Sequence, residues 1–277
     1  MPRLYLLDAN GLAHWCYHSH PEMTDALGAP VSALHGVREW LFDFMDRYSP
    51  THIAACFDGP LKSNWRKLKA AEYKSARVAK PKDEALMSQL PHMPGEFERL
   101  GVRTLKVDGF EADDIIATLA VSHASPEVGV VVVSSDKDLM QLVGEHVKQF
   151  DPRPNKAGQT TFYGPAEVEE KHGVPPHRLQ EYLALVGDAS DSIPGVEKWG
   201  KVKAINAIKQ TKSRSELIRK ARAGQLEHID AKHQALLVAQ LPAFELSFEL
   251  VGLAYDVPLD VTLDDLAWRG LPQGEAA

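Results

Sequence analysis

Short apolar runs alternate with amphipathic stretches through the first two thirds of the chain. Four almost continuously apolar segments, RLYLLDAN, HIAACFDG, VRTLKVDG and VGVVVVSSD, each end in turn-forming or acidic residues. Helical patterns lie between them, for example at 31–47 and 115–123. Apolar strands that alternate with helices predict an α/β domain whose mainly parallel sheet is covered on both faces.

Two regions depart from this alternation. Residues 60–95 form a basic, Pro-punctuated insertion of helical composition, and from about residue 165 the chain has the pattern of short helices. In that last part only LAYDV, at 253–257, is a further strand candidate. We therefore expect an α/β domain over 1–164 with an insertion at 60–95, followed by a helical region over 165–277.

The composition is that of a folded globular protein, with 44% hydrophobic and 25% charged residues. The longest apolar runs fall far below the ~20 residues of a membrane helix, and residues 1–30 show no secretory signal. Two cysteines, Cys16 and Cys56, cannot form a disulfide framework. We expect a cytoplasmic monomer that has no membrane partner.

The net charge of −7 hides a segregated distribution. Residues 62–82 contain eight Lys and Arg against one acid, Glu72, and residues 198–222 contain nine against one acid, Glu216. A polyanion would experience these segments locally in spite of the acidic average. The alternative is that both segments are ordinary solvated helix faces.

Acidic residues recur where the expected strands end. Asp8, Asp58 and Asp136 each follow an apolar run, and a further set lies at the start of helices or turns: Glu111, Asp113, Asp114, Asp138, Asp188 and Asp191. One such Asp is usually a turn former or a helix cap. Many carboxylates at one sheet edge would repel each other without a cation, and oxygen-only ligands suit Mg²⁺ or Mn²⁺. Two such ions ~4 Å apart support phosphodiester hydrolysis.

Three other motifs are weaker. GVEKWGK at 195–201 matches the first part of a phosphate-binding loop, but Val202 stands where Ser or Thr is needed and no strand precedes it. The segment DANG at 8–11 resembles the start of an aspartyl-phosphate phosphatase, but Asn10 replaces its second acid. His14 and His18 have the spacing of zinc ligands on a helix but lack the intervening Glu of metalloproteases.

Six blocks, taken together, resemble the signature of the 5′-nuclease superfamily. They are LLDANGLAH, CFDG, NWRKLKAAEYKSAR, GFEADD, SSDKDLMQL and GDASDSIPGVEKWGKVKA, in order from about residue 3 to 210. This superfamily includes flap endonucleases and the 5′→3′ exonuclease domain of bacterial DNA polymerase I. The resemblance implies a resolvase-like (PIN-like) α/β fold and a helical arch formed by residues 60–95.

The resemblance also implies roles for the acidic residues. Asp8, Asp58, Glu111 and Asp113 match the first metal cluster, with Asp114 beside them. The second cluster is matched by Asp136, Asp138, Asp188 and Asp191. The acidic set is therefore complete, whereas some relatives similar to exonuclease IX lack members of the second cluster.

The insertion matches the basic positions of the family. Lys74 and Arg77 match the pair near the scissile phosphate, where they would stabilise developing negative charge. Arg66 matches a position that would steer the 5′ strand. Tyr73 matches an aromatic position and is either a platform for a displaced base or a packed side chain.

Residues 187–209 resemble the helix-three-turn-helix element that binds duplex backbone. Gly195 and Gly200 would allow close approach to phosphate, and Lys201 or Lys203 would contact it. Family members often bind K⁺ in this turn. Trp199 and Val202 replace smaller or polar residues there.

The sequence thus predicts a structure-specific 5′ nuclease. It would cut DNA near single-strand/double-strand junctions such as 5′ flaps, using Mg²⁺ or Mn²⁺, and leave a 5′-phosphate and a 3′-hydroxyl. A PIN-type ribonuclease is an alternative, although it needs neither basic segment. A non-catalytic junction-binding protein would lack metal ligands, and a small-molecule phosphatase would leave both basic segments unexplained.

Overall fold

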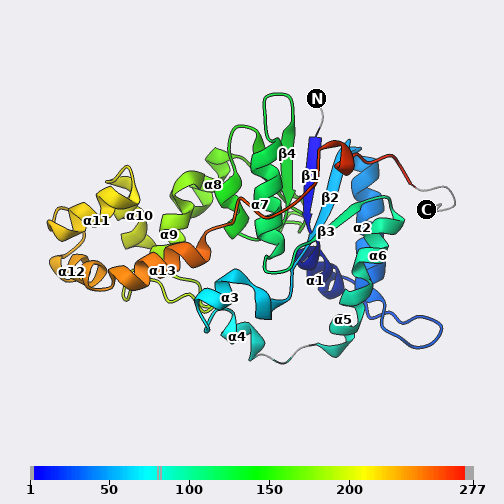
Figure 1. Ribbon diagram of the computed structural model, residues 1–277, viewed down its shortest axis with the longest axis horizontal. Coiled ribbons are helices and arrows are strands. Elements are labelled where there is room, and N and C mark those ends of the chain that lie inside the picture. Colours follow the sequence, from blue (N-terminus) through cyan, green and yellow to red (C-terminus); the bar gives the residue numbers. More distant parts are fainter. Residues whose placement is uncertain (1–2, 80, 82, 272–277) are drawn as a thin grey trace.

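A six-stranded sheet forms the centre of the first part of the molecule (Figure 1). The computed structural model describes residues 3–79, 81 and 83–271. The strand order is β3-β2-β1-β4-β5-β6, and all neighbours are parallel except the pair β5 and β6. The strands are β1 (Arg3–Asp8), β2 (His52–Phe57), β3 (Arg103–Lys106), β4 (Gly129–Val133), β5 (Val147–Asp151) and β6 (Thr161–Tyr163). The expected mainly parallel α/β sheet is confirmed.

Both faces of the sheet are buried, which explains the continuous apolar runs. In β1, Tyr5 and Leu7 pack with α1 (Ala9–Ser19), α2 (Ser32–Tyr48) and α6 (Met93–Arg99). Leu4 and Leu6 point to the other face, where α7 (Ala112–His123) packs. The helices expected at 31–47 and 115–123 are therefore present as α2 and α7.

The insertion at 60–95 consists of short helices that follow β2. They are α3 (Trp65–Lys69), α4 (Ser75–Val78) and α5 (Glu84–Gln89), with 3₁₀ turns at Leu61–Ser63 and Leu90–His92. Two members of the first basic segment, Lys80 and Lys82, lie outside the described residues. In Figure 1, α3 and α4 lie between α13 and α1, below the carboxyl ends of the strands.

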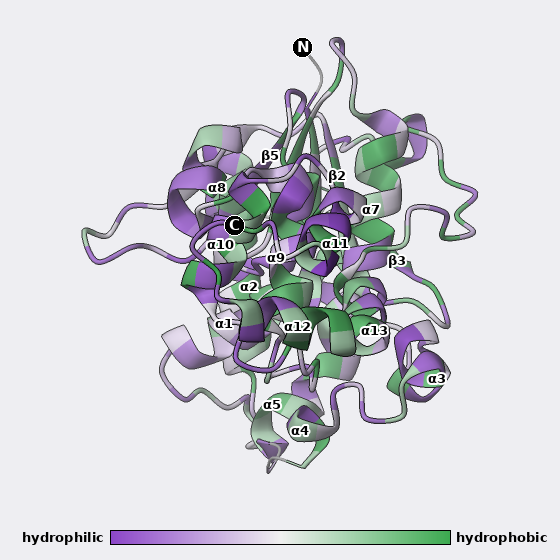
Figure 2. Ribbon diagram, turned by 90° about the vertical axis from the view of Figure 1, so that its left-hand side faces the viewer, coloured by the Kyte–Doolittle hydropathy of each residue, from purple (hydrophilic) through white to green (hydrophobic). Residues whose placement is uncertain are grey.

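The helical region extends away from the sheet and has a core of its own. It comprises α8 (Pro165–His172), α9 (Leu179–Val186), α10 (Lys201–Lys209), α11 (Arg214–Arg222), α12 (Ala231–Ala239) and α13 (Leu241–Val251). Figure 2 shows α11 as largely hydrophilic and α13 as mostly hydrophobic, and α11 contributes only Leu217 and Ala221 to the buried residues of this core. None of these helices is by itself long and apolar enough to cross a membrane in the described part of the chain; α12 and α13 reach that only as a pair bent by 72°.

After α13 the chain returns to the sheet. Val257 and Leu266 join the core on the α7 face, and Ala267 forms an isolated β-bridge with His52. The strand expected at 253–257 is wrong, because these residues lie in irregular backbone. The boundary near residue 164 stays a prediction, but the segment that follows residue 252 packs on the α/β domain rather than on the helical region.

Candidate metal and nucleic-acid site

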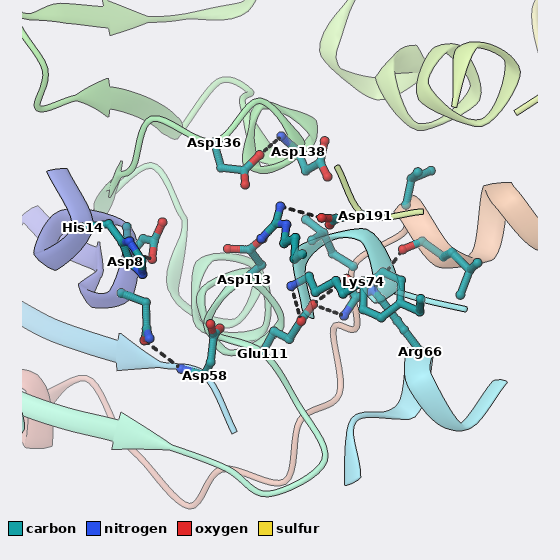
Figure 3. A pocket seen from close by; sticks show the side chains of 17 residues that line it. Asp8, His14, Asp58, Arg66, Lys74, Glu111, Asp113, Asp136, Asp138 and Asp191 are labelled. Atoms are coloured by element: carbon teal, nitrogen blue, oxygen red, sulfur yellow. Dashed lines mark hydrogen bonds and ion pairs between the residues drawn. The ribbon is translucent and has the colours of Figure 1, made fainter. Parts of the chain in front are cut away.

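Seven carboxylates line one cavity of about 290 Å³ at the carboxyl edge of the sheet (Figure 3). Parallel strands bring their carboxyl ends to one edge, so residues far apart in sequence meet there. The acids that line the cavity are Asp8, Asp58, Glu111, Asp113, Asp136, Asp138 and Asp191.

Asp8 ends β1 and caps α1. Its carboxylate accepts hydrogen bonds from the Gly11 amide (2.9 Å) and from the Ser134 hydroxyl (2.9 Å), which fixes its orientation. Burial and the nearby Asp58 raise the pKa of Asp8 to about 6 in spite of these hydrogen bonds. A carboxylate whose ionisation is opposed in this way gains free energy when a cation is placed beside it.

Asp58 follows β2 and is hydrogen-bonded to residues of α1 and α7 at the carboxyl edge of the sheet. Its backbone amide donates to the Asn10 side chain (3.1 Å), and its carboxylate accepts from the Ala112 amide at the start of α7 (2.9 Å). Burial raises its pKa, and the nearby Glu111 adds to this. The side chain is therefore held at the cavity by backbone contacts.

The start of α7 contributes two acids that face the cavity. Glu111 precedes the helix, and its carboxylate accepts from the Tyr73 hydroxyl (2.8 Å) and from the Lys74 ammonium group. Burial, with Asp136 and Asp8 nearby, raises the pKa of Asp113 well above its usual range. The charge of Asp113 is thus opposed first by burial and then by the neighbouring acids.

Asp136 and Asp138 follow β4. The carboxylate of Asp136 accepts the Asp138 amide at 2.9 Å, and burial together with Asp136 raises the pKa of Asp138 to about 7. The Oδ1 atom of Asp138 is buried without a hydrogen-bond partner. A buried acceptor of this kind is costly unless a cation or donor satisfies it.

Asp188 and Asp191 lie on the loop after α9, and both have cationic partners. Lys137 contacts Asp188, and hydrogen bonds from Lys137 and Ser190 outweigh burial, so the pKa of Asp188 falls to about 2. Arg77 pairs with Asp191 at 2.5 Å, while burial raises the pKa of Asp191. Asp188 does not line the cavity.

The donor set fits hard divalent cations. Every acid of the edge offers oxygen, several have pKa values raised by burial and mutual repulsion, and one buried oxygen of Asp138 is unpartnered. No group of three or more His, Cys, Asp or Glu side chains is arranged to hold an ion among the residues that the structure describes. Lys74 and Arg77 instead lie among the carboxylates and neutralise part of their charge.

Contrary to expectation, Asp114 does not lie with the candidate metal ligands. It is 0% exposed and binds the guanidinium of Arg66 through both oxygens, at 2.7 and 2.8 Å. Burial raises its pKa, but the Arg66 hydrogen bonds outweigh burial, so the pKa lies below its usual range. Asp114 therefore fixes Arg66 and does not line the cavity.

The expected role of Arg66 in steering a DNA strand is also wrong for this conformation. Arg66 is 3% exposed and additionally donates to the backbone oxygens of Leu250 (3.0 Å) and Gly252 (2.6 Å). Figure 3 shows it reaching from α3 toward Glu111. Through this ion pair and these hydrogen bonds, Arg66 links α3 to α7 and to the end of α13.

For Tyr73 the packing alternative holds. The side chain is 3% exposed, and its hydroxyl donates to Glu111 at 2.8 Å. A ring that is buried in this way presents no face for a base. Tyr73 instead orients an acid of the cavity.

Lys74 and Arg77 both line the cavity beside its acids, and the catalytic role expected for them stays a prediction. Lys74 contacts Glu111 from one side of the cavity and Arg77 pairs with Asp191 from another, and both side chains line it. Lys74 has a left-handed backbone (φ 56°), which is uncommon for a residue other than glycine. The insertion thus places two cations beside the carboxylate edge.

The turn between α9 and α10 is shaped by close packing of its own backbone and by a buried Trp199. Gly195 (φ 66°) is required by internal packing, because a Cβ atom would lie 2.5 Å from the Gly187 amide nitrogen, and its expected approach to phosphate stays a prediction. Gly200 precedes α10 and has open space where a Cβ atom would lie. Lys201 is exposed and Lys203 half-buried, both in the first turn of α10. Trp199 is buried, and its indole N–H donates to the His233 carbonyl (3.0 Å).

Sequence reasoning missed the residues that hold the acids in place. Ser134 orients Asp8, and Lys137 neutralises Asp188. Asn10, which stands where a phosphatase motif has its second acid, accepts a hydrogen bond from the Asp58 amide. His14 also lines the cavity, and burial lowers its pKa. The position of Ser134 and Lys137 within SSDKDL, directly after a strand, was the available signal.

Comparison with known proteins assigns the whole arrangement to one family. Residues 3–173 match the family model described as 5′-3′ exonuclease, N-terminal resolvase-like domain, and residues 174–273 match 5′-3′ exonuclease, C-terminal SAM fold. The chain belongs to the 5′-3′ exonuclease family, and the resemblance noted in its sequence is confirmed.

The chain is similar to relatives of two kinds, one of about its own length and one much longer. A 5′-3′ exonuclease of Aquifex aeolicus is 32% identical over 266 residues, which are 96% of this chain and 86% of the relative. DNA polymerase I of Bacillus subtilis is 31% identical over 272 residues, which are 97% of this chain but 30% of the polymerase. The chain therefore spans under a third of that polymerase relative.

Solved structures share the fold. A T5 5′-exonuclease with divalent metal ions (zinc) bound has a TM-score of 0.71 at 23% identity, covering 92% of this chain and 91% of that one. A bacteriophage T5 D15 flap endonuclease with DNA and metal ions has a TM-score of 0.68 at 20% identity, covering 90% of this chain and 88% of the other.

Proposed function

We propose that this protein is a divalent-metal-dependent, structure-specific 5′ nuclease that hydrolyses DNA phosphodiesters near single-strand/double-strand junctions. The observation that carries the proposal is the cavity in which seven carboxylates and the cations Lys74 and Arg77 meet. A phosphodiester needs both kinds of group: oxygen ligands for metal ions, and fixed cations for the charge that develops on the phosphoryl oxygens.

The residues of the first half of the edge would hold the metal. Asp8, Asp58 and Asp113 have raised pKa values, and none of the three is in an ion pair with a basic side chain among the described residues. Their carboxylates are therefore available to bind metal ions. Bound divalent ions would activate water for attack on phosphorus and stabilise the leaving oxygen. Asp136, Asp138 and Asp191 would extend the ligand set.

Lys74 and Arg77 would exchange partners when DNA binds. In this structure they neutralise Glu111 and Asp191, and a phosphate in the cavity would offer them anionic oxygens instead. The carboxylates released in this way would then be free to bind cations. The products would be a 5′-phosphate and a 3′-hydroxyl.

Duplex DNA would be bound by the second basic segment, outside the cavity. Lys201 and Lys203 stand in the first turn of α10, at the positive end of a nine-residue helix. Contacts of this kind bind backbone phosphate without reading bases, so specificity would come from the shape of the junction. We expect Mg²⁺ or Mn²⁺ as the divalent ions, K⁺ in the turn before α10, and a monomer as the active species.

The alternatives receive less support. A decayed, non-catalytic junction-binding protein would lack acids, whereas the edge holds seven in one cavity. A PIN-type ribonuclease would explain the sheet edge but neither α10 nor the insertion. The names of the relatives, exonuclease and DNA polymerase I, favour DNA as the substrate and roles in replication and repair.

The test is cleavage of a 5′-labelled flap duplex in Mg²⁺ and in EDTA, with single-stranded and blunt duplex DNA as comparisons. We expect metal-dependent cutting close to the flap junction and weak cutting of the blunt duplex. Asp58→Asn should bind the flap with unchanged affinity and not cut it. Tight binding by the unaltered chain without cutting in any divalent ion would replace this proposal with the junction-binding function.

A further inference from the structure

We propose that Ser192 is a positioning residue that latches the segment carrying Lys74 and Arg77 to the loop carrying Asp188 and Asp191. The inference deepens the proposed function and rests on it for its kinetic consequence. Three contacts make the latch. The Lys74 amide donates to the Asp191 carbonyl (2.8 Å), the Ala76 amide donates to the Ser192 hydroxyl oxygen (3.0 Å), and the Ser192 and Ser75 hydroxyls lie 3.2 Å apart.

On one side of the latch, the segment is held by the latch and by the ion pairs Lys74–Glu111 and Arg77–Asp191, and not by apolar packing of α4. Helix α4 is four residues long and contains no buried residue. A single helical turn is not stable in water without tertiary contacts. Its position therefore depends on the contacts at its first residues, where Lys74 takes a left-handed backbone that turns its amide toward Asp191.

The loop on the other side is closed by its own backbone hydrogen bonds and close packing. Asp188 and Ile193 exchange two backbone hydrogen bonds of 2.8 Å, and the loop ends where Gly195 packs closely on Gly187. Ser192 itself has a left-handed backbone (φ 61°), which directs its side chain to the Ala76 amide. A helical turn without buried residues is thus docked on a loop that is closed by its own backbone contacts.

The latch sets the position of both proposed catalytic cations. Lys74 reaches Glu111 and Arg77 reaches Asp191, each within two residues of a latch contact. The Ser192 hydroxyl takes part in the latch without being a carboxylate of the candidate metal set. It can therefore be removed while every proposed metal ligand is kept.

Ser192→Gly removes the hydroxyl and keeps a residue that accepts the left-handed backbone. Ser49→Gly is the matched control, because Ser49 is an exposed serine with a left-handed backbone (φ 42°) at the end of α2. Hydrogen exchange of the metal-free proteins should show the Ala76 amide exchanging about five- to tenfold faster in Ser192→Gly alone. Unchanged exchange at Ala76 would overturn the latch.

Kinetics then test the positioning role. With saturating flap DNA in Mg²⁺, Ser192→Gly should lower the single-turnover rate about tenfold and leave the Kd for the flap unchanged. Ser192→Asn should restore the rate to within about threefold, because Asn tolerates the left-handed backbone and offers an acceptor oxygen.

Two results would overturn the inference. One is a wild-type rate in Ser192→Gly; the other is faster exchange throughout the protein, which would show general destabilisation rather than loss of a latch. If the unaltered chain failed to cut the flap, the proposed function would fail, while the exchange comparison would still decide whether the latch exists.

Discussion

Residues 62–82 and 198–222 are both strongly basic in sequence, but among the described residues only the first segment places cations beside the acids that line the cavity. In the first segment Arg66 is buried on Asp114, and Lys74 and Arg77 neutralise acids of the cavity. In the second segment six of the nine cations are exposed: Lys198, Lys201, Lys209, Lys212, Arg219 and Arg222. A run of positive charge can thus serve the acids of its own protein or remain available for another polyanion, and only the fold distinguishes the two.

The largest effect should come from removing the buried cation of the first segment. Arg66→Ala leaves Asp114 buried without its partner, which costs about 3–5 kcal/mol of stability in comparable ion pairs. Urea unfolding of the metal-free protein measures this. Lys69→Ala is the control, because its pair with Glu249 is exposed and should contribute below about 1 kcal/mol. Equal losses in the two variants would contradict the distinction between inward and outward cations.

Lys74→Ala should lower the single-turnover cleavage rate about 10²–10³-fold, the effect of removing one preorganised donor from an active site. The exposed Lys62 belongs to the same segment, and Lys62→Ala should change the rate less than about threefold. Flap affinity measured in Ca²⁺ should be similar in both variants. A slow Lys62→Ala variant would mean that the whole segment acts through charge alone.

The stability of the metal-free protein should fall as the pH rises from about 4 to 7. The pKa values of Asp8 and Asp138 are raised to about 6 and about 7, so the folded state holds protons that the unfolded chain has already released. Their loss should therefore lower the free energy of unfolding as the pH rises. The melting temperature in EDTA should therefore be higher at pH 5 than at pH 8.

Asp138→Asn is the control for this pH effect and should flatten the dependence. Mg²⁺ should raise the melting temperature more at pH 8 than at pH 5, because ions compete with protons for the same oxygens. A melting temperature that rises with pH in EDTA would show that Lys74 and Arg77 already neutralise the edge.

The smallest effect should come from the second segment. Lys203→Ala should weaken duplex binding about two- to fivefold and reduce the slope of log K against log salt by about 1. The single-turnover rate with saturating DNA should not change. A reduced rate at saturation would place Lys203 in the catalytic machinery and remove the contrast between the two segments.

The sequence was sufficient for the sheet and for most of the acidic edge. Continuous apolar runs predict strands buried on both faces, and Asp8, Asp58 and Asp136 follow these runs directly, so topology alone brings them together. Asp114 could not be separated from Asp113 in this way, because neighbouring residues at a helix start point in different directions. The pairing of Asp114 with Arg66 brings together residues 48 positions apart.

Side chains whose role depends on distant segments were predicted less well. Arg66 can be buried because the carbonyls of Leu250 and Gly252, more than 180 residues later, accept hydrogen bonds from its guanidinium. Tyr73 is buried against Glu111 for a similar reason. Local pattern shows that such residues are basic or aromatic, but it does not show which way they point.

The return of the chain to the sheet after α13 limits how this molecule can be divided. Val257 and Leu266 complete the core beneath α7, so a chimera that exchanged everything after residue 173 would also replace part of the cover of the first domain. A cut after residue 252 would expose the same apolar face. The two family segments should accordingly unfold together in one cooperative transition, and swapping the DNA-binding helices between relatives should succeed only when residues 253–268 stay with their own sheet.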